Sequence, residues 1–403
     1  MRKIKLLFDV EQLAVDGLKG TGIVRVCDEL LRGLNTIPDI DVFPVITSER
    51  GNFDVYLKEK GLYDIFKDKT VYLPKLKATT KRYNFYQKLR SYLLCFMYRH
   101  SYQKELQKYD AYLSLFSPIS PIVYQSSVKT YMVIHDLIPI YYPEGCSSKF
   151  VKKFAMWMKQ AQANGYFCIS SATIKDFLRF RKGIKTGPVY KLYLGADDKF
   201  KPIHNQKMIT AVKEKYHIKT DKYFLAVSEL TARKNLPHLL ESFVLFLNKT
   251  KATDISLVLV GPKRDGYEAL HQMIDGLDKY QNKIITTGFV LDDDLPILYS
   301  GAKGFIYPSL YEGFGLPILE AMKAGTPVIT ADNTSLPEVA GDAGLYITGQ
   351  NVTETSNALI KLYQDKNLAH RLSQKGLKQA QKFNWQTTIE TIVRVLNKKQ
   401  KEK

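Results

Sequence analysis

The sequence is poor in the residues that cross-link small proteins or bind structural metals. Only four cysteines occur among 403 residues, Cys27, Cys95, Cys146 and Cys168, and none stands in a C-x-x-C pair or beside a histidine pattern. Neither a zinc site nor a disulfide framework is therefore indicated. Scattered cysteines of this kind are typical of a reducing compartment, so the sequence predicts a cytoplasmic location.

Long hydrophobic runs are also missing. The longest stretch without a charged residue covers 111–128, and its prolines, Pro118 and Pro121, suit a strand and a loop rather than a bilayer span. Near the start of the chain, Asp9 and Glu11 interrupt the apolar residues after a few positions. A strand is expected there rather than a signal peptide.

Acidic residues are outnumbered, because 59 Lys and Arg against 40 Asp and Glu give a net charge of +19. In residues 75–108, cations alternate with aromatic and aliphatic residues against a single acid, Glu105. This pattern predicts a basic aromatic helix that can lie on an anionic membrane. A core helix with a solvated basic face is a second interpretation. Nucleic-acid binding is least favoured, and we predict none, because no recognised nucleic-acid motif is present.

Short β-rich runs alternate with amphipathic segments along the chain, which predicts an α/β fold with parallel sheets covered on both faces by helices. Strands are expected near residues 4–10, 42–47, 111–115, 131–135, 166–170 and 189–194, and again near 223–228, 256–260, 284–287, 304–307, 327–331 and 344–347. Periodicity is lost near 197–206, where we place a joint between two Rossmann-like domains. The predicted division is residues 1–200, residues 201–380, and a last helix with a basic tail at 381–403.

The most informative stretch is YEGFGLPILEAMKAGTPVITA at 311–331. Gly313 and Gly315 let the backbone approach a ligand closely, and Pro317 suits the first position of a helix. Gly325 ends that helix before the next strand. The stretch predicts a strand, a turn and a helix whose bared amides attract a phosphate.

Two carboxylates, Glu312 and Glu320, flank this turn. Because they would repel a phosphate, they are expected to accept hydrogen bonds from neutral hydroxyl groups, one from a sugar and one from a ribose. The charge of a diphosphate would instead meet Arg233 and Lys234, which follow the strand near 223–228 and precede a helix. An ordinary turn with solvated charges is the plainer alternative for each motif taken alone.

In combination, these motifs resemble the C-terminal half of retaining glycosyltransferases of the GT-B fold, in family 4. The E-x7-E motif of that family is matched by Glu312 and Glu320, and its arginine-lysine pair by Arg233 and Lys234. The run 288–347 resembles the family in order and spacing. The resemblance covers most of the chain, densely in the second half, and implies a GT-B architecture of two Rossmann-like domains facing across a cleft.

The resemblance implies a role for each motif. Arg233 and Lys234 would bind the donor diphosphate, Glu320 the ribose and Glu312 the sugar hydroxyls. The remaining residues that it assigns to the donor are Gly22, Val290, Gly313, Phe314, Gly315 and Leu316. Arg25 lies near Gly22, and for Arg25 itself a simple solvated position is equally open.

His135 ends the strand TYMVIH and is followed by Asp136. Ligands of α/β folds bind where strand ends point into a crevice, although a lone histidine is more often structural. The resemblance implies that His135 contacts the donor sugar. The loop with Gly17, Gly20 and Gly22 lacks the G-x-G-x-x-G spacing, so a nicotinamide-dependent oxidoreductase is a poor fit.

Neither a metal nor a cofactor is predicted. Asp292, Asp293 and Asp294 precede Leu295 and Pro296, and this run is typical of a helix cap rather than of a metal-binding Asp-x-Asp pair. The nucleotide diphospho-sugar would be a co-substrate.

The resemblance therefore implies a metal-independent, retaining hexosyltransferase that acts on a glycan or lipid-linked glycan acceptor in surface polysaccharide synthesis, such as lipopolysaccharide. GDP-mannose is the favoured donor, and rhamnose, glucose and N-acetylglucosamine donors stay open. The alternatives are a catalytically inactive GT-B scaffold or nucleotide-sugar binding protein and, among enzymes, a GT-B-like epimerase or phosphorylase. Residues 75–108 would dock the protein peripherally on the inner face of the plasma membrane.

Overall fold

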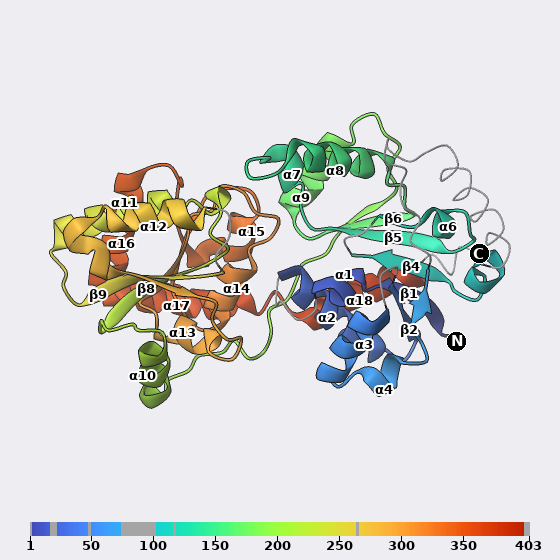
Figure 1. Cartoon of the computed structure of the whole chain (residues 1–403), viewed down its shortest axis with the longest axis horizontal. Helices are drawn as coiled ribbons and strands as arrows, with labels where there is room; N and C mark the ends of the chain where they lie inside the picture. Colours follow the sequence, from blue (N-terminus) through green and yellow to red (C-terminus); the bar gives the residue numbers. More distant parts are fainter. Residues whose placement is uncertain are drawn as a thin grey trace.

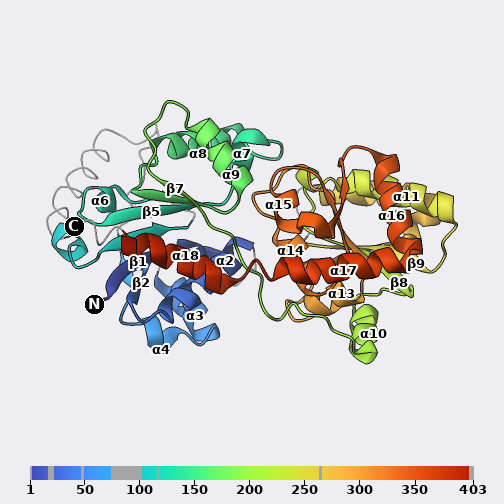
Figure 2. The same cartoon turned by 180° about the vertical axis from the view of Figure 1, so that it is seen from behind.

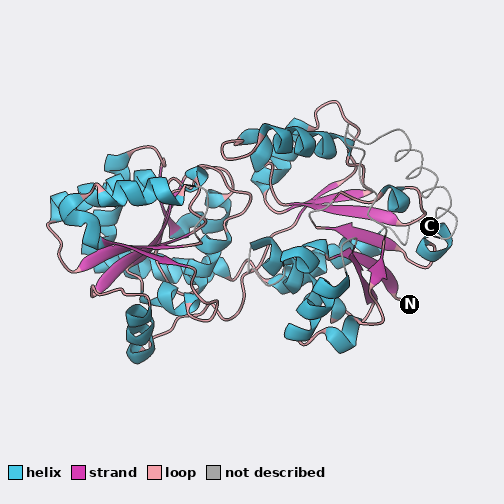
Figure 3. Cartoon of the chain, in the orientation of Figure 1, coloured by secondary structure: helices cyan, strands magenta, loops and turns pink. Residues whose placement is uncertain are grey.

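The computed structural model describes residues 2–16, 22–46, 50–73, 102–115, 118–262 and 266–398. The chain forms two lobes, each a twisted sheet between layers of helices (Figures 1 and 3). Most of the predicted basic aromatic helix, residues 74–101, lies outside the described residues. That prediction is therefore not tested by the structure.

The first lobe contains, within the described residues, a seven-stranded parallel sheet in the order β3-β2-β1-β4-β5-β6-β7. Its strands are β1 Ile4–Asp9, β2 Ile40–Ile46, β3 Val71–Tyr72, β4 Ala111–Ser114, β5 Lys129–Ile134, β6 Gly165–Cys168 and β7 Val189–Lys191. Its helices are α1 Glu11–Asp16, α2 Gly22–Asn35, α3 Arg50–Glu59, α4 Tyr63–Phe66, α6 Pro121–Tyr124, α7 Ile138–Tyr141, α8 Ser148–Gln160 and α9 Ser171–Phe180. The central strands are nearly continuous apolar runs because helices cover both of their faces.

The second lobe contains, in the described part of the chain, a six-stranded parallel sheet in the order β10-β9-β8-β11-β12-β13. Its strands are β8 Lys222–Val227, β9 Ile255–Val260, β10 Ile284–Gly288, β11 Gly304–Tyr307, β12 Val328–Ala331 and β13 Gly344–Ile347. Its helices are α10 Gln206–Lys215, α11 Leu236–Thr250, α12 Tyr267–Asp275, α13 Leu295–Gly301, α14 Leu316–Lys323, α15 Leu336–Ala340, α16 Val352–Gln364 and α17 Lys366–Ala380. Short 3-10 helices cover Ala232–Lys234, Asp278–Lys283 and Gly341–Ala343.

The chain crosses between the lobes twice. It first passes from β7 to α10 through the segment where the sequence loses its periodicity, and α18, Trp385–Lys398, then returns to the first lobe (Figure 2). Ile389 of α18 is buried and packs where Gly33 of α2 leaves room, and the Thr388 hydroxyl donates to the Tyr193 carbonyl at 2.6 Å. The last helix is thus part of the first lobe's packing.

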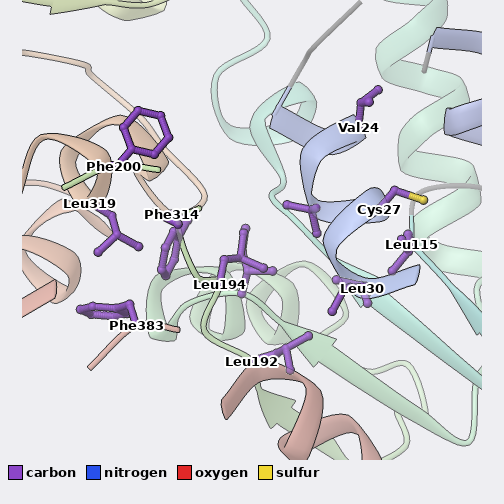
Figure 4. Close-up of a cluster of buried hydrophobic side chains, with 14 of the residues drawn as sticks. Val24, Cys27, Leu30, Leu115, Leu192, Leu194, Phe200, Phe314, Leu319 and Phe383 are labelled. Atoms are coloured by element: carbon purple, nitrogen blue, oxygen red, sulfur yellow. The ribbon is translucent and has the colours of Figure 1, made fainter. Parts of the chain in front are cut away.

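An apolar seam joins the lobes (Figure 4). Leu192 and Leu194 belong to the same buried cluster as Phe314, Leu319 and Phe383 from the later part of the chain. The ring of Phe314 lies 5.8 Å from that of Phe383 between centroids. Burial of large apolar side chains is strongly favourable, so this seam holds the lobes in contact.

The predicted strands are confirmed, since each expected range overlaps an observed strand. The two-residue strand β3 was not among the expected strands, and the short helix α1 directly follows β1, ahead of α2. None of the helices in the described part of the chain has the length and apolar content that a bilayer crossing requires.

Candidate active site

The centre of the candidate site is the carboxylate of Glu312, which lies in the loop after β11. Its Oε1 accepts hydrogen bonds from Arg233 Nη1 at 2.5 Å and from Lys234 Nζ at 2.6 Å. The hydroxyls of Ser309 and Tyr307 donate to the same oxygen at 2.6 and 3.0 Å. The structure therefore brings both predicted cations and one predicted glutamate together around a single oxygen atom.

Backbone contacts fix the cations in this position. Arg233 and Lys234 form a 3-10 turn that ends at Asn235, whose φ of 58° is left-handed. The Arg233 carbonyl accepts from the Leu310 amide at 2.9 Å, and Arg233 Nη1 donates to the Tyr311 carbonyl at 2.7 Å. Both the backbone and the side chain of Arg233 thus bind the turn after β8 to the loop that carries Glu312.

Electrostatics keep Glu312 ionised. Burial alone would raise the pKa of its carboxyl, but Lys234 and Arg233 outweigh burial and lower this pKa to about 2. Two cations thus meet one carboxylate in a buried place, and the buried Asp136 also interacts electrostatically with Arg233. Both cations can donate charge-assisted hydrogen bonds to a bound anion.

The helix that follows the loop begins as predicted. Gly315 precedes α14 with a φ of 113°, a left-handed conformation that favours glycine. Leu316 and Pro317 lie in the first turn of α14, and Gly325, at a φ of 77°, lies two positions after its last residue, Lys323. The side chain of Leu316 faces α2 across the lobe boundary, 3.9 Å from the position of a Cβ on Gly22.

Gly313 carries a direct contact between the lobes. A Cβ on Gly313 would lie 2.2 Å from the carbonyl oxygen of His135, so only glycine fits here. The Gly313 carbonyl accepts hydrogen bonds from the hydroxyls of Ser170 at 2.7 Å and Thr173 at 3.1 Å. The predicted histidine and the predicted glycine turn are therefore in contact, through the backbone of both.

The imidazole of His135 is buried at the carboxyl end of β5. Burial lowers its pKa to about 4, against an opposing hydrogen bond with the Leu115 backbone. The ring is therefore neutral at physiological pH. A neutral imidazole can donate to or accept from a sugar hydroxyl.

The second glutamate, Glu320 of α14, is buried and is bound from the other lobe. Arg25 of α2 donates to its Oε1 at 2.7 Å, and the Tyr299 hydroxyl donates to its Oε2 at 3.0 Å. Arg25 also reaches Asp292 at 3.3 Å. From the sequence, Arg25 could be either a site residue or a solvated side chain. The structure shows it in an ion pair with Glu320.

The side chain of Phe314, a residue that the resemblance assigns to the donor, is buried in the apolar seam, and the residue is 3% exposed. One sequence interpretation needs correction. Asp294 was expected to cap α13, but its side chain makes no cap hydrogen bond. It accepts instead from Lys215 and Tyr216 at 2.6 and 2.7 Å.

Val290 is buried at 6% exposure within the apolar cluster. Like Phe314, it offers little side-chain surface to a ligand. Within the described residues, no group of three or more His, Cys, Asp or Glu side chains has a metal-binding arrangement.

Some residues of the site carry no sequence signal of their own. Tyr307 and Ser309 bind Glu312 and lie directly at the end of β11, where an α/β fold gathers ligand-binding groups. Tyr299 binds Glu320 from α13, a helix with no motif. Their position at the end of a strand could have indicated that Tyr307 and Ser309 belong to the site. No local sequence pattern indicates the same for Tyr299.

Comparison with known proteins finds relatives that include O-antigen mannosyltransferases. The chain is 38% identical over 182 residues to O-antigen chain mannosyltransferase B of Escherichia coli, which covers 45% of this chain and 47% of that protein. It is 28% identical over 283 residues to the serotype-specific mannosyltransferase WbdA of Escherichia coli, or 68% of this chain and 34% of WbdA. The match thus spans about half the length of these relatives or less.

Among solved structures, Anabaena HepE in complex with UDP and glucose superposes with a TM-score of 0.73 at 17% identity, covering 98% of this chain and all of HepE. This likeness shows the fold, which is the predicted GT-B architecture. The family model described as glycosyl transferases group 1 matches residues 208–379, which include Arg233, Lys234, Glu312 and Glu320. Residues 208–379 are thus similar to the group 1 glycosyl transferases, in agreement with the family 4 resemblance.

Proposed function

We propose that the chain is a retaining glycosyltransferase that moves a hexosyl group from a nucleotide diphospho-sugar to a glycan or lipid-linked glycan acceptor in surface polysaccharide synthesis. The single observation that carries the proposal is the cluster of Arg233, Lys234 and Glu312 beside the start of α14. Such a cluster meets the charge of a leaving diphosphate. Relatives named as O-antigen mannosyltransferases support a mannosyl donor, and GDP-mannose is our first choice.

The hard step in this proposal is the departure of the nucleoside diphosphate. Arg233, Lys234 and the amides at the start of α14 stabilise the negative charge that develops on the leaving oxygen, an effect worth about 3 kcal/mol or more in a water-poor site. Glu312, held ionised, keeps both cations oriented before the donor arrives. Preorganised charge of this kind needs no rearrangement during the reaction. The diphosphate is neutralised without a resident metal.

The remaining groups orient the donor. Glu320 binds the ribose, Glu312 contributes its second oxygen to the sugar, and the neutral imidazole of His135 contacts a sugar hydroxyl. The acceptor hydroxyl approaches from the face that the phosphate leaves, and a phosphate oxygen takes its proton. No side chain acts as a nucleophile. This course is the one implied by the family, and it fits a site in which both carboxylates are already engaged by cations.

The test is a panel of nucleotide sugars, including GDP-mannose, UDP-glucose and UDP-N-acetylglucosamine, followed by mass spectrometry for transferred hexose and released nucleoside diphosphate. Arg233→Ala should lower kcat by roughly a hundredfold or more, whereas Arg371→Ala, at an exposed position of α17, should leave it unchanged. Binding of a nucleotide sugar without turnover of any donor would favour the inactive scaffold. Full turnover by the Arg233 variant would overturn the assignment of the cluster.

A further inference from the structure

Helix α9 lies on the side of the first lobe that faces the second, across from α15 (Figures 1 and 2). Ser170, Thr173 and Asp176 stand three positions apart at its start, so they share one side of the helix. Ser170 and Thr173 are buried. Because buried hydroxyl groups are hydrogen-bonded in folded proteins, their partners show what this row of polar side chains holds.

The partners of this row lie on both sides of Glu312. The Thr173 hydroxyl donates to the Gly313 carbonyl at 3.1 Å, and the Tyr311 hydroxyl donates to the carboxylate of Asp176. Burial and this hydrogen bond raise the pKa of Tyr311, so its hydroxyl keeps the proton that it donates. The residue before Glu312 and the residue after it are therefore both bound by one helix of the opposite lobe.

The same Thr173 hydroxyl also reaches His135. It lies 3.4 Å from the His135 carbonyl oxygen, the atom that a Cβ on Gly313 would meet at 2.2 Å. One proton is thus shared between two backbone carbonyls that belong to different lobes. Thr173 thereby links the strand end that bears the imidazole to the loop that bears the Glu312 carboxylate.

Contacts within the second lobe do not by themselves set this spacing. The Glu312 amide donates to the Thr334 hydroxyl at 3.1 Å, and the Glu312 carbonyl accepts from the Ser335 hydroxyl at 3.0 Å. Both partners belong to the same lobe as the loop, so they fix the loop within that lobe. The contacts of α9 fix the loop relative to His135.

We propose that Thr173 and Asp176 are positioning residues for glycosyl transfer, because α9 sets the spacing between His135 and Glu312, the groups from the two lobes that meet one sugar. The inference rests on the proposed function, to which it adds no new chemistry. Transfer rates fall steeply when a bound substrate is displaced by about 1 Å. In this assignment the two side chains do not touch the donor and act through their partners in the second lobe.

A positioning role predicts a separation of turnover from nucleotide binding. The groups that we assign to the diphosphate and the ribose, Arg233, Lys234 and Glu320, all lie in the second lobe. Loosening α9 should therefore leave the affinity for a nucleoside diphosphate unchanged. The sugar, which is held from both lobes, should lose its orientation, so kcat should fall.

The test compares variants that remove a hydrogen-bonding group with variants that keep it, on a donor that wild type uses. Thr173→Val should lower kcat by about tenfold, whereas Thr173→Ser, which keeps the hydroxyl, should stay within about twofold of wild type. Asp176→Ala should also lower kcat by about tenfold, and Asp176→Asn, which keeps an acceptor for Tyr311, should restore most of it. Calorimetric titration with GDP or UDP should give a Kd within about twofold of wild type in all four.

A double-mutant cycle and a control locate the effect. Tyr311→Phe should lower kcat as Asp176→Ala does, and the double variant should lose no more than either, because both remove one bond. Tyr193→Phe removes a different hydrogen bond between the lobes, from the Tyr193 hydroxyl to Glu338 at 2.6 Å. This control should keep the wild-type kcat. Thermal unfolding shows that each variant is folded.

The inference is overturned if Thr173→Val keeps the wild-type kcat, or if its affinity for the nucleoside diphosphate falls as far as its kcat. It is also overturned if Tyr193→Phe loses as much turnover as Thr173→Val, since a general loosening of the lobes would then explain both. Should Thr173→Val fail to fold, Tyr311→Phe, at a half-buried position, gives the same test.

Hydrogen exchange separates this inference from the proposed function. If wild type transfers no sugar from any donor, the proposed function fails, and the contact of α9 with the loop is measured without turnover. Amides in the peptide 309–315 should then exchange about tenfold faster in Thr173→Val with Asp176→Ala than in wild type or Tyr193→Phe. Equal exchange in the three proteins would show that α9 does not hold the loop.

Discussion

Arg25 of the first lobe and Glu320 of the second form an ion pair of 2.7 Å across the lobe boundary. The Arg25 side chain is 31% exposed and that of Glu320 only 6%. Burial raises the pKa of Glu320, and Arg25 and the Tyr299 hydroxyl oppose that rise. The carboxylate that we assign to the ribose is therefore bound by a cation of the opposite lobe.

Removing Arg25 should destabilise the protein, because Glu320 would lose its ion-pair partner and keep the hydrogen bond from Tyr299. We expect Arg25→Ala to cost about 1–2 kcal/mol of unfolding free energy, between the values of exposed and buried pairs. A double-mutant cycle with Glu320→Gln, measured by urea unfolding, should give a coupling energy of about 1 kcal/mol. The exposed pair Arg2 and Asp110, at 3.3 Å, should give less than about 0.5 kcal/mol. Equal coupling in the two pairs would contradict a structural role for Arg25.

Gly313 and Gly22 should respond differently to alanine. A Cβ on Gly313 would overlap the His135 carbonyl at 2.2 Å, whereas a Cβ on Gly22 would meet Leu316 at an ordinary 3.9 Å. We expect Gly313→Ala to cost about 2 kcal/mol or more, and Gly22→Ala to remain within about 0.5 kcal/mol of wild type. Thermal or urea unfolding decides between them, and equal costs would mean that the lobes do not meet at Gly313.

His135 should make stability depend on pH. Its pKa is about 4 in the folded chain and about 6.5 when unfolded, so the unfolded state binds more protons between these values. Stability therefore falls as pH drops through this interval. Between pH 7 and 4.5 wild type should lose about 2 kcal/mol more than His135→Gln. The control His204→Gln, at an exposed position, should keep the wild-type dependence of stability on pH. If His135→Gln also kept that dependence, the imidazole of His135 would lie in water.

Binding of a nucleoside and of a nucleoside diphosphate should distinguish the residue that binds the ribose from the one that binds the diphosphate. Glu320→Ala should weaken binding of the nucleoside and of the nucleoside diphosphate alike, because both carry the ribose. Arg233→Ala should weaken only the diphosphate, by about tenfold or more. Calorimetric titration with guanosine and GDP, repeated with uridine and UDP, measures both. Glu268→Ala, at an exposed position of α12, is the control, and identical losses in the two variants would remove the assigned roles.

Local sequence predicted much of the fold because strand periodicity and turn residues act over a few positions. The strand Gly304–Tyr307 and the helix start at Leu316 follow from apolar runs, Gly315 and Pro317. The strand Val71–Tyr72 is too short to produce a pattern. The side chain of Asp294 does not cap α13, because its carboxylate accepts hydrogen bonds from Lys215 and Tyr216, which lie 79 and 78 positions away in the sequence.

The sequence predicted several residues of the candidate site but not the contacts between them. Arg233, Lys234 and Glu312 were expected to face one ligand, but their direct contact depends on how two turns meet. The pairing of Arg25 with Glu320 joins residues 295 positions apart. Such a pairing follows only from the docking of the lobes, which no local pattern encodes.

The return of α18 to the first lobe affects how the chain can be assembled during synthesis. Its residues Ile389, Ile392 and Val395 are buried, yet they are made only after the entire second lobe. A domain usually folds as its own residues leave the ribosome. Here the first lobe stays incomplete, with part of α2 uncovered, until the second has been synthesised, so the lobe made first is the one completed last.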